Sequence, residues 1–298
     1  MTSTQSQEYL RKWRENPAFG ATGFDFDGLR EGMATRREPS DTTIRCQPAD
    51  IDGLPGEWVI APGANPDLRL LYLHGGGYIS GSAANYLAMT AHISKAAGCV
   101  VLLPDYRLAP EHPFPAGLED CIRAYDWIRA NGPAGPAPAE TTFIAGDSAG
   151  GGLTLATLLA RRDRRLPLPK AAIVLSPFSD LTLTGESIRS VGVQDPIMHP
   201  SCLPDFVSRY VSAGDVRNPL ASPLFGDYTG IPPLLIQVGE HEIIRSDSLQ
   251  TADRARVGGV DVTLEVWQGM FHVFQSHEPL LPEAVEAIEH IAAFMRRE

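Results

Sequence analysis

The sequence has few of the features that mark membrane, secreted and metal-binding proteins. No apolar run reaches the roughly 18 residues that a membrane-spanning helix needs, and residues 1–7 lack the apolar core of a signal peptide. Only four cysteines occur, with no CxxC pair and no zinc-ligand spacing. These absences predict a cytoplasmic protein with reduced thiols, without a bound metal and without a membrane span.

Positive charge is also scarce, since 25 Lys and Arg face 36 Asp and Glu, for a formal net charge of -11. An acidic surface repels phosphate backbones, so nucleic acid is not an expected partner. The chain has no internal repeats, and its 298 residues are enough to bury a substantial core.

Short apolar runs alternate with longer helical stretches. The runs that predict buried strands are 68–73, 99–103, 142–145, 171–175, 233–238 and 262–267. The stretches that predict helices are 86–97, 116–130, 151–162, 246–257 and 282–297. Alternation of this kind predicts an α/β fold with a mostly parallel sheet flanked by helices. Segments 42–47 and 56–61 add an antiparallel pair, for eight strands in total.

A nucleophile motif lies at one strand-to-helix junction. Gly146-Asp147-Ser148-Ala149-Gly150 is G-x-S-x-G, and it follows a predicted strand and precedes a predicted helix. The flanking glycines allow a tight, strained turn that exposes the serine hydroxyl above the sheet. The pattern therefore indicates Ser148 as a nucleophile, with Asp147 either orienting the turn or facing water.

A glycine-rich loop follows the first apolar run, and it reads His74-Gly75-Gly76-Gly77-Tyr78. Its backbone N–H groups can approach a substrate closely and stabilise an oxyanion, together with the N–H of the residue after the nucleophile. The predicted donors are Gly76, Gly77 and Ala149, with Gly75 as a further candidate. No Lys follows these glycines, so a phosphate-binding P-loop is excluded, and His74 is expected to be structural.

The G-x-S-x-G turn between a strand and a helix is typical of α/β-hydrolases, in which the chain order is Ser, then Asp or Glu, then His. The general base is therefore expected after the last strand. His272 is in that position, whereas His277 and His290 fall in later elements. The acid is expected after the preceding strand. Glu242 is favoured there as the group that would orient the His272 imidazole. The alternatives are Glu240, Asp247 and Asp253.

The chain resembles the bacterial hormone-sensitive-lipase-like family of esterases. The resemblance is carried by HGGGY at 74–78, DYRLAPEHPFPA at 105–116, GDSAGG at 146–151 and GMFHVF at 269–274, over about residues 58–297. In that family the acid often lies in a G-x-D-P-L sequence. His241 occupies the usual Asp position here, so the resemblance implies that Glu242, one residue later, takes the role.

The family resemblance also implies a cap over the active site. Two irregular regions are candidates: the aromatic-rich N-terminus and a long Pro-, Ser- and Asp-rich connection. We expect an N-terminal cap segment (1–45), a catalytic domain (46–180 and 231–298) and a cap insertion (181–230). The family further implies structural roles for Asp105, Arg107 and Glu111, and a homodimer through an exposed edge strand.

Together these features predict a serine carboxylesterase that needs no cofactor and acts on a small-molecule ester. Short- to medium-chain acyl esters are expected, and lactones fit the same chemistry. The predicted pocket residues are Tyr78, Tyr86, Met198, Phe206 and Tyr210. The alternatives are a ligand-binding protein on a hydrolase scaffold, which the presence of His272 opposes, and an amidase or peptidase with the same triad.

Overall fold

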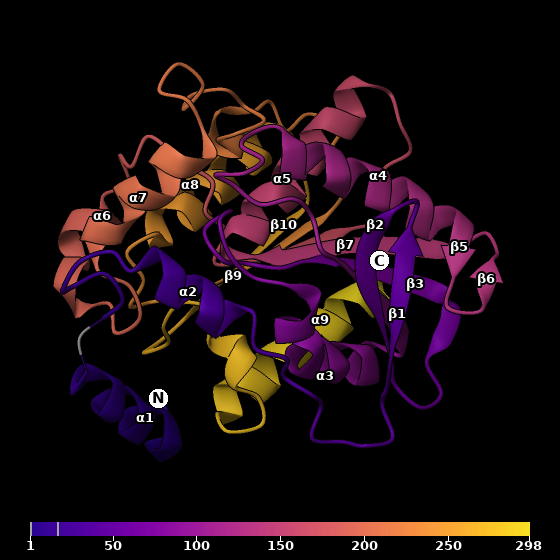
Figure 1. Cartoon of the computed structure of the whole chain (residues 1–298), viewed down its shortest axis with the longest axis horizontal. Helices are drawn as coiled ribbons and strands as arrows, with labels where there is room; N and C mark the ends of the chain where they lie inside the picture. Colours follow the sequence, from indigo (N-terminus) through magenta and orange to yellow (C-terminus); the bar gives the residue numbers. More distant parts are fainter. Residues whose placement is uncertain (1, 17) are drawn as a thin grey trace.

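The fold is given by a computed structural model of the chain, which describes residues 2–16 and 18–298. Its centre is an eight-stranded sheet in the order β1-β2-β4-β3-β7-β8-β9-β10 (Figure 1). The strands are β1 (Arg45–Ile51), β2 (Leu54–Ile60), β3 (Asn65–Leu73), β4 (Cys99–Pro104), β7 (Thr141–Asp147), β8 (Ala172–Leu175), β9 (Leu234–Gly239) and β10 (Val262–Trp267). Strands β3, β4 and β7 to β10 run parallel, and β2 pairs antiparallel with both β1 and β4. The predicted α/β fold with eight mostly parallel strands is confirmed.

The predicted bounds of the first strand were wrong. Strand β1 begins at Arg45 rather than at residue 42, and Ile51 pairs with Leu54 across a two-residue turn. Asp52 and Gly53 in that turn have φ angles of 51° and 84°. Asp-Gly with both residues at positive φ is the favoured turn of a tight hairpin, and it sets the register of the pair. The antiparallel segments therefore form one continuous hairpin.

Helices cover both faces of the sheet. They are α3 (Leu87–Ala97), α4 (Ala116–Ala130), α5 (Ser148–Asp163), α8 (Arg245–Val257) and α9 (Pro282–Arg297). Because side chains alternate along a strand, Leu71 and Leu73 of β3 join the core beneath α4, α5 and α8, whereas Leu70 and Tyr72 join the core beneath α3 and α9. Helix α5 begins three residues before the predicted start at residue 151. A short hairpin of β5 (Asn131–Gly132) and β6 (Gly135–Pro136) follows α4.

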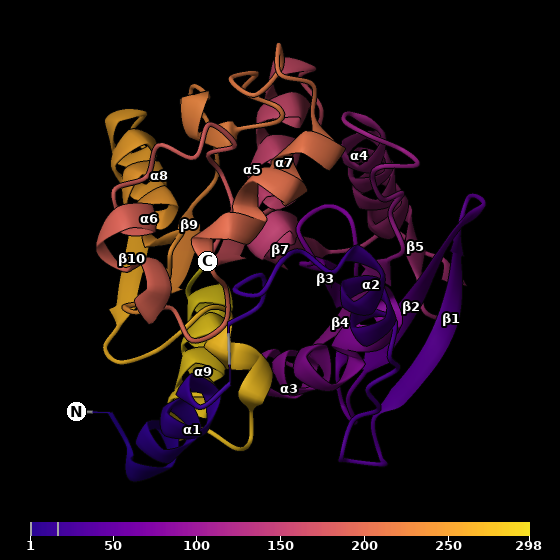
Figure 2. The same ribbon diagram turned by 60° about the vertical axis from the view of Figure 1, so that its left-hand side comes forward.

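The two irregular regions lie on the same side of the molecule. They carry α1 (Thr4–Arg14) and α2 (Phe26–Met33) from the N-terminus, and α6 (Ser187–Ser190) and α7 (Leu203–Tyr210) from the long connection (Figures 1 and 2). Phe19 forms a backbone bridge with Met198, and its N–H donates to the Ile197 carbonyl over 2.8 Å. The Phe206 ring packs against Phe19 and Phe24, with centroids 6.2 and 5.4 Å apart. The two segments thus form one layer. Among the described helices, none is long and apolar enough to cross a membrane.

Candidate active site

The sharp turn after β7 exposes Ser148. Strand β7 ends at Asp147, and Ser148 opens helix α5 with φ 51°. A Cβ on Gly146 would overlap the Gly150 carbonyl, and a Cβ on Gly150 would overlap the backbone of Leu73 in β3. Both glycines are therefore required by the close approach of strand, turn and helix, as the G-x-S-x-G pattern indicated. The serine is held in a strained conformation at the wall of a cavity.

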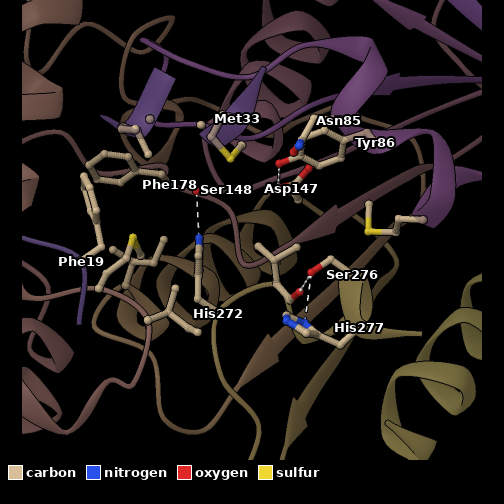
Figure 3. A pocket seen from close by; sticks show the side chains of 18 of the residues that line it. Phe19, Met33, Asn85, Tyr86, Asp147, Ser148, Phe178, His272, Ser276 and His277 are labelled. Atoms are coloured by element: carbon tan, nitrogen blue, oxygen red, sulfur yellow. Dashed lines mark hydrogen bonds between the residues drawn. The ribbon is translucent and has the colours of Figure 1, made fainter. Parts of the chain in front are cut away.

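Ser148, His272 and Glu242 form a continuous hydrogen-bonded chain, although they come from three separate parts of the sequence. The His272 Nε2 lies 2.9 Å from the Ser148 hydroxyl (Figure 3). Its Nδ1 lies 2.9 Å from the Glu242 carboxylate. His272 follows β10, as expected. The loop that carries it is anchored by the adjacent Phe271, which is fully buried and stacks on Tyr9 of α1.

The Glu242 carboxylate is fully buried and is held on both oxygens. One oxygen accepts from the Ser176 hydroxyl over 2.8 Å and from the Gly239 backbone N–H, and the other faces His272. Burial by itself lowers the pKa of the His272 imidazole. The hydrogen bond and the negative charge of Glu242 outweigh that effect, so the pKa of His272 is raised above its ordinary value. The arrangement favours an imidazole that can accept a proton from Ser148.

The alternative acids are engaged elsewhere. Asp247 accepts the backbone N–H groups of residues 179 and 180, each over 2.8 Å, and burial raises its pKa to about 8. Glu240 accepts a backbone N–H from the loop after β10. The Asp253 side chain is 77% exposed. Glu242 is thus the one of the four sequence candidates that contacts His272.

A residue that the sequence analysis missed ties the long connection after β8 to the segment that carries Glu242. Asp195 is buried and accepts the backbone N–H of Ile243, next to Glu242, over 2.9 Å. It also accepts the N–H groups of Ile197 and Met198 in the same connection. Burial raises the pKa of Asp195 to about 6. No local motif distinguishes such an aspartate in a Pro- and Asp-rich segment.

Two of the predicted oxyanion donors lie in the cavity wall. Gly76 and Gly77 both line the cavity and have φ angles of 123° and 63°. A Cβ on Gly77 would overlap the Phe206 ring. Ala149 is the second residue of α5, so its N–H has no acceptor within the helix. These three N–H groups can converge on an oxygen bound beside Ser148.

The candidate donor Gly75 is corrected by the structure. Its N–H is already used, since it donates to the Asp147 carboxylate over 3.0 Å and to the Tyr86 hydroxyl over 3.1 Å. Asp147 is buried and also accepts from the hydroxyls of Tyr72 and Tyr86, each over 3.0 Å. Burial raises the pKa of Asp147 to about 6, while the tyrosine hydrogen bonds oppose that rise. Asp147 therefore orients the glycine loop against the turn rather than facing water.

The other candidate histidines have different surroundings. His74 is buried and stacks on Tyr106 at 4.2 Å, and burial lowers its pKa to about 4, which fits the structural role expected of it. His290 pairs with Glu265 outside the cavity. His277 lines the cavity, and burial lowers its pKa to about 4. Within residues 2–16 and 18–298, no group of three His, Cys, Asp or Glu side chains is arranged to hold a metal ion.

The DYRLAPEHPFPA block after β4 supports the glycine loop. Asp105 accepts the N–H at the start of the short 3-10 helix η1 (Ala83–Tyr86) over 2.7 Å. Arg107 is paired with the buried Asp120, and Glu111 is paired with Arg30 of α2. Arg30 also donates to the carbonyls of residues 79 and 109, so this block fastens the N-terminal segment beside the loop.

The cavity has a volume of about 580 Å³ and reaches from the N-terminal segment and the long connection to Ser148 and His272. Of the predicted pocket residues, Tyr86, Met198 and Phe206 line it. The prediction that Tyr78 and Tyr210 line the pocket was wrong. Their rings stack on each other at 3.9 Å in the core, and the Tyr78 hydroxyl donates to the Phe178 carbonyl. A large aromatic side chain in a motif or in an amphipathic helix can either line a pocket or pack in the core, and these two pack in the core.

The sequence analysis missed much of the lining, above all the share from the N-terminal segment. The unpredicted lining side chains include Trp13, Phe19, Leu29, Met33, Arg37, Phe178, Leu203, Ile244, Ser276 and His277. The aromatic residues near the N-terminus were the available signal, but the sequence does not say which of them face inward.

Comparison with known protein families and structures gives concordant matches. A family described as having the α/β hydrolase fold matches residues 70–276. The chain is 42% identical over 240 residues to an acetyl-hydrolase of Streptomyces hygroscopicus, covering 80% of this chain and 79% of that protein.

Two solved structures are similar over nearly the whole chain. One is the esterase EstE5 soaked with p-nitrophenyl butyrate, with TM-score 0.91 and 39% identity over 99% of this chain and 98% of that one. The other is an esterase from the bacterial hormone-sensitive lipase family, with TM-score 0.88 and 40% identity over 100% and 99% of the two chains.

Proposed function

The chain belongs to the α/β-hydrolase family, in its bacterial hormone-sensitive-lipase-like branch, and is a carboxylic ester hydrolase; we propose that it cleaves esters through an acyl-enzyme on Ser148. The observation that carries the proposal is the hydrogen-bonded chain from Ser148 through His272 to Glu242, with two distances of 2.9 Å. That chain ends at a cavity large enough for a small substrate.

In the proposed first step, His272 takes the proton of Ser148 as the serine oxygen attacks the ester carbonyl. The negative oxygen that forms accepts from the N–H groups of Gly76, Gly77 and Ala149. His272 then gives its proton to the departing alcohol, leaving an ester between the acyl group and the serine. Glu242 stabilises the imidazolium throughout and keeps its Nδ1 proton in place.

In the second step, water enters and gives its proton to His272 while its oxygen attacks the acyl-serine carbonyl. The same three N–H groups stabilise the second oxyanion. Collapse of this intermediate returns the proton to Ser148 and releases the carboxylic acid. Lactones fit the same sequence of steps, because their ring oxygen is the leaving alcohol.

We propose short- to medium-chain acyl esters as substrates. A volume of about 580 Å³ lies within the roughly 300–1,000 Å³ of small-molecule sites, and the aromatic and aliphatic lining suits an acyl chain. Each methylene buried there contributes about 0.8 kcal/mol, so kcat/KM is expected to rise about fourfold per methylene until the chain fills the cavity. The structural relative soaked with p-nitrophenyl butyrate agrees with this range.

The cap and the setting of the protein are part of the proposal. Residues 1–45 and 181–230 act as the cap, which is supported by the lining side chains that both segments contribute to the cavity. Strand β10 ends one edge of the sheet and is a candidate for pairing with a second copy. Light scattering of the purified protein tests the dimer. The free thiols of the four cysteines support a reducing, cytoplasmic setting.

The test is hydrolysis of p-nitrophenyl acetate, butyrate and octanoate by the native protein, by Ser148→Ala and by the surface control Ser212→Ala. Removing the nucleophile is expected to lower kcat by about 10⁴-fold or more, while the control keeps the native rate. A fluorophosphonate should label the native protein at Ser148 and leave Ser148→Ala unlabelled. Equal hydrolysis by the native protein and Ser148→Ala would refute the serine mechanism.

A further inference from the structure

The two sides of the cavity differ in chemistry. Figure 3 shows Phe19 and Phe178 on one side of the Ser148–His272 pair. On the other side lie polar side chains: Asn85, Tyr86, Ser276 and His277. An ester held at Ser148 extends in two directions, with its acyl group to one side and its alcohol to the other. One half of the substrate is therefore expected to meet polar groups.

Arg37 also lines the cavity and lies beside these polar groups. Its backbone N–H donates to the Ala84 carbonyl over 2.9 Å, and its carbonyl accepts from the Ala88 N–H over 3.1 Å. These bonds fasten Arg37 to the segment that carries Asn85 and Tyr86. His277 lines the same cavity, and the Arg37 charge adds to the effect of burial that lowers the pKa of this histidine.

Arg37 differs from its neighbour Arg36. The Arg36 guanidinium pairs with Glu38 and with Glu57, each at 2.5 Å, away from the cavity. For Arg37, the part of the chain that the structure describes supplies no ion pair and no side-chain hydrogen bond. An arginine in this position is a planar set of N–H donors with an uncompensated charge at the wall of a site.

Nearby carboxylates are already neutralised or bonded. Asp147 also lines the cavity, but its oxygens accept from two tyrosines and from Gly75. Glu278, next to His277, lies against the His92 ring, and burial raises the pKa of its carboxyl group to about 7. His277 itself is held neutral by burial, which lowers its pKa to about 4. At neutral pH the polar side of the cavity therefore carries the positive charge of Arg37, neutral donors, and the Asp147 carboxylate, whose oxygens are already hydrogen-bonded.

We propose that Arg37 binds a carboxylate group carried by the ester substrate, away from the bond that is cleaved. Arginine and carboxylate form paired, charge-assisted hydrogen bonds, which are stronger than bonds between neutral groups. Asn85 is suited to assist, because its side chain is buried in the wall and donates to the Thr35 carbonyl, which fixes its orientation. The preferred substrates are thus small esters with an acidic group in one half, and this inference rests on the proposed esterase function.

Matched ester pairs test the proposal and identify the half that carries the acid. Monoethyl glutarate and its carboxamide counterpart differ by one charge in the acyl half. 4-Acetoxybenzoate and 4-acetoxybenzamide differ by one charge in the alcohol half. For each pair, kcat/KM of the acid divided by kcat/KM of the amide is measured for the native protein, Arg37→Gln and Arg36→Gln, with thermal unfolding as the check on folding.

Arg37→Gln is expected to lower the acid-to-amide ratio about three- to fivefold for one of the two pairs, which corresponds to one charge-assisted contact made by an exposed arginine. Arg36→Gln removes the same charge from the neighbouring position and should leave both ratios within twofold of native. Raising the salt concentration should lower the ratio in the native protein but not in Arg37→Gln, because salt screens the contact.

Ratios in Arg37→Gln within twofold of native for both pairs would overturn the proposal. An equal loss in Arg36→Gln would also overturn it, since the effect would then come from net charge. Both outcomes leave hydrolysis of the carboxamide esters intact. Failure of the native protein to hydrolyse any of the four esters or p-nitrophenyl butyrate would instead count against the esterase function.

Discussion

Replacing Glu242 by glutamine keeps the shape of the side chain and removes its charge. One carboxylate oxygen accepts from the Gly239 N–H and the Ser176 hydroxyl, and the other faces the Nδ1 of His272. A backbone N–H can only donate, so the amide oxygen of the variant must occupy the first position. The amide NH₂ then faces Nδ1 and forces it to accept. The imidazole proton moves to Nε2, where it faces Ser148 and blocks proton removal.

Two contributions set the expected loss. A carboxylate and an imidazolium about 4 Å apart attract by about 4 kcal/mol at an effective dielectric constant of 20, or roughly 10³-fold in rate. The unfavourable tautomer adds to this, and the corresponding change in serine proteases lowers kcat by about 10⁴-fold. We therefore expect Glu242→Gln to lower kcat for p-nitrophenyl butyrate by about 10³- to 10⁴-fold.

The pH dependence should change as well. Activity requires neutral His272, so it rises with pH through the pKa of this residue. Glu242 holds that pKa above its ordinary value. Loss of the carboxylate lowers the pKa, and the acidic limb of the kcat/KM profile should move to lower pH in the variant.

Asp247→Asn is the matched control for Glu242→Gln. Asp247 is an equally buried carboxylate nearby in sequence, but it accepts backbone N–H groups at residues 179 and 180 instead of contacting His272. An amide oxygen can still accept those bonds, so kcat should stay within about threefold of native. The reasoning is refuted if Glu242→Gln keeps more than a tenth of the native kcat, or if Asp247→Asn lowers kcat more than Glu242→Gln does.

Three further predictions concern the glycine loop, the cavity and stability. Gly77→Ala places a Cβ against Phe206 at positive φ and should lower kcat about 10²- to 10³-fold. Gly63→Ala is also at positive φ but in open space, so it should keep the native kcat and cost only about 1 kcal/mol in unfolding free energy. Equal kcat in both variants would contradict the oxyanion assignment. Phe206→Leu shortens a wall side chain and should raise the ratio of octanoate to butyrate hydrolysis several-fold, and an unchanged ratio would place the acyl chain elsewhere. Burial raises the pKa of Asp247 to about 8, so the folded protein binds this proton more tightly than the unfolded chain does, and its contribution to stability is lost as pH rises from about 4 to about 8. Between pH 5 and 8 the Tm of Asp247→Asn should therefore fall less than that of the native protein. An equal fall in both proteins would argue against a raised pKa.

Much of the fold follows from local pattern. Buried strands such as β4 and β8 are continuous apolar runs, because both faces of a parallel sheet are covered by helices, and the helices between them are long enough to recognise. The predicted start of helix α5 was too late, because its first residues include glycine and serine, which have low helix propensity. Packing of Gly150 against the Leu73 backbone stabilises that first turn instead.

The sequence by itself determined Ser148 and His272 as side chains to bring together, because strand ends meet at one edge of a parallel sheet. Chain order and strand position favoured Glu242 but left three other acids open, and the contact with His272 in the tertiary structure distinguished it. The tertiary structure decided what surrounds them. The Gly75 N–H donates to Asp147, and the Tyr78 ring stacks in the core. Neither outcome can be predicted from local sequence, because both depend on contacts between residues far apart in the chain. For the N-terminal residues in the cavity wall, including Arg37, the sequence does not say which side chains point inward, since that direction is set by packing against residues far away in the chain.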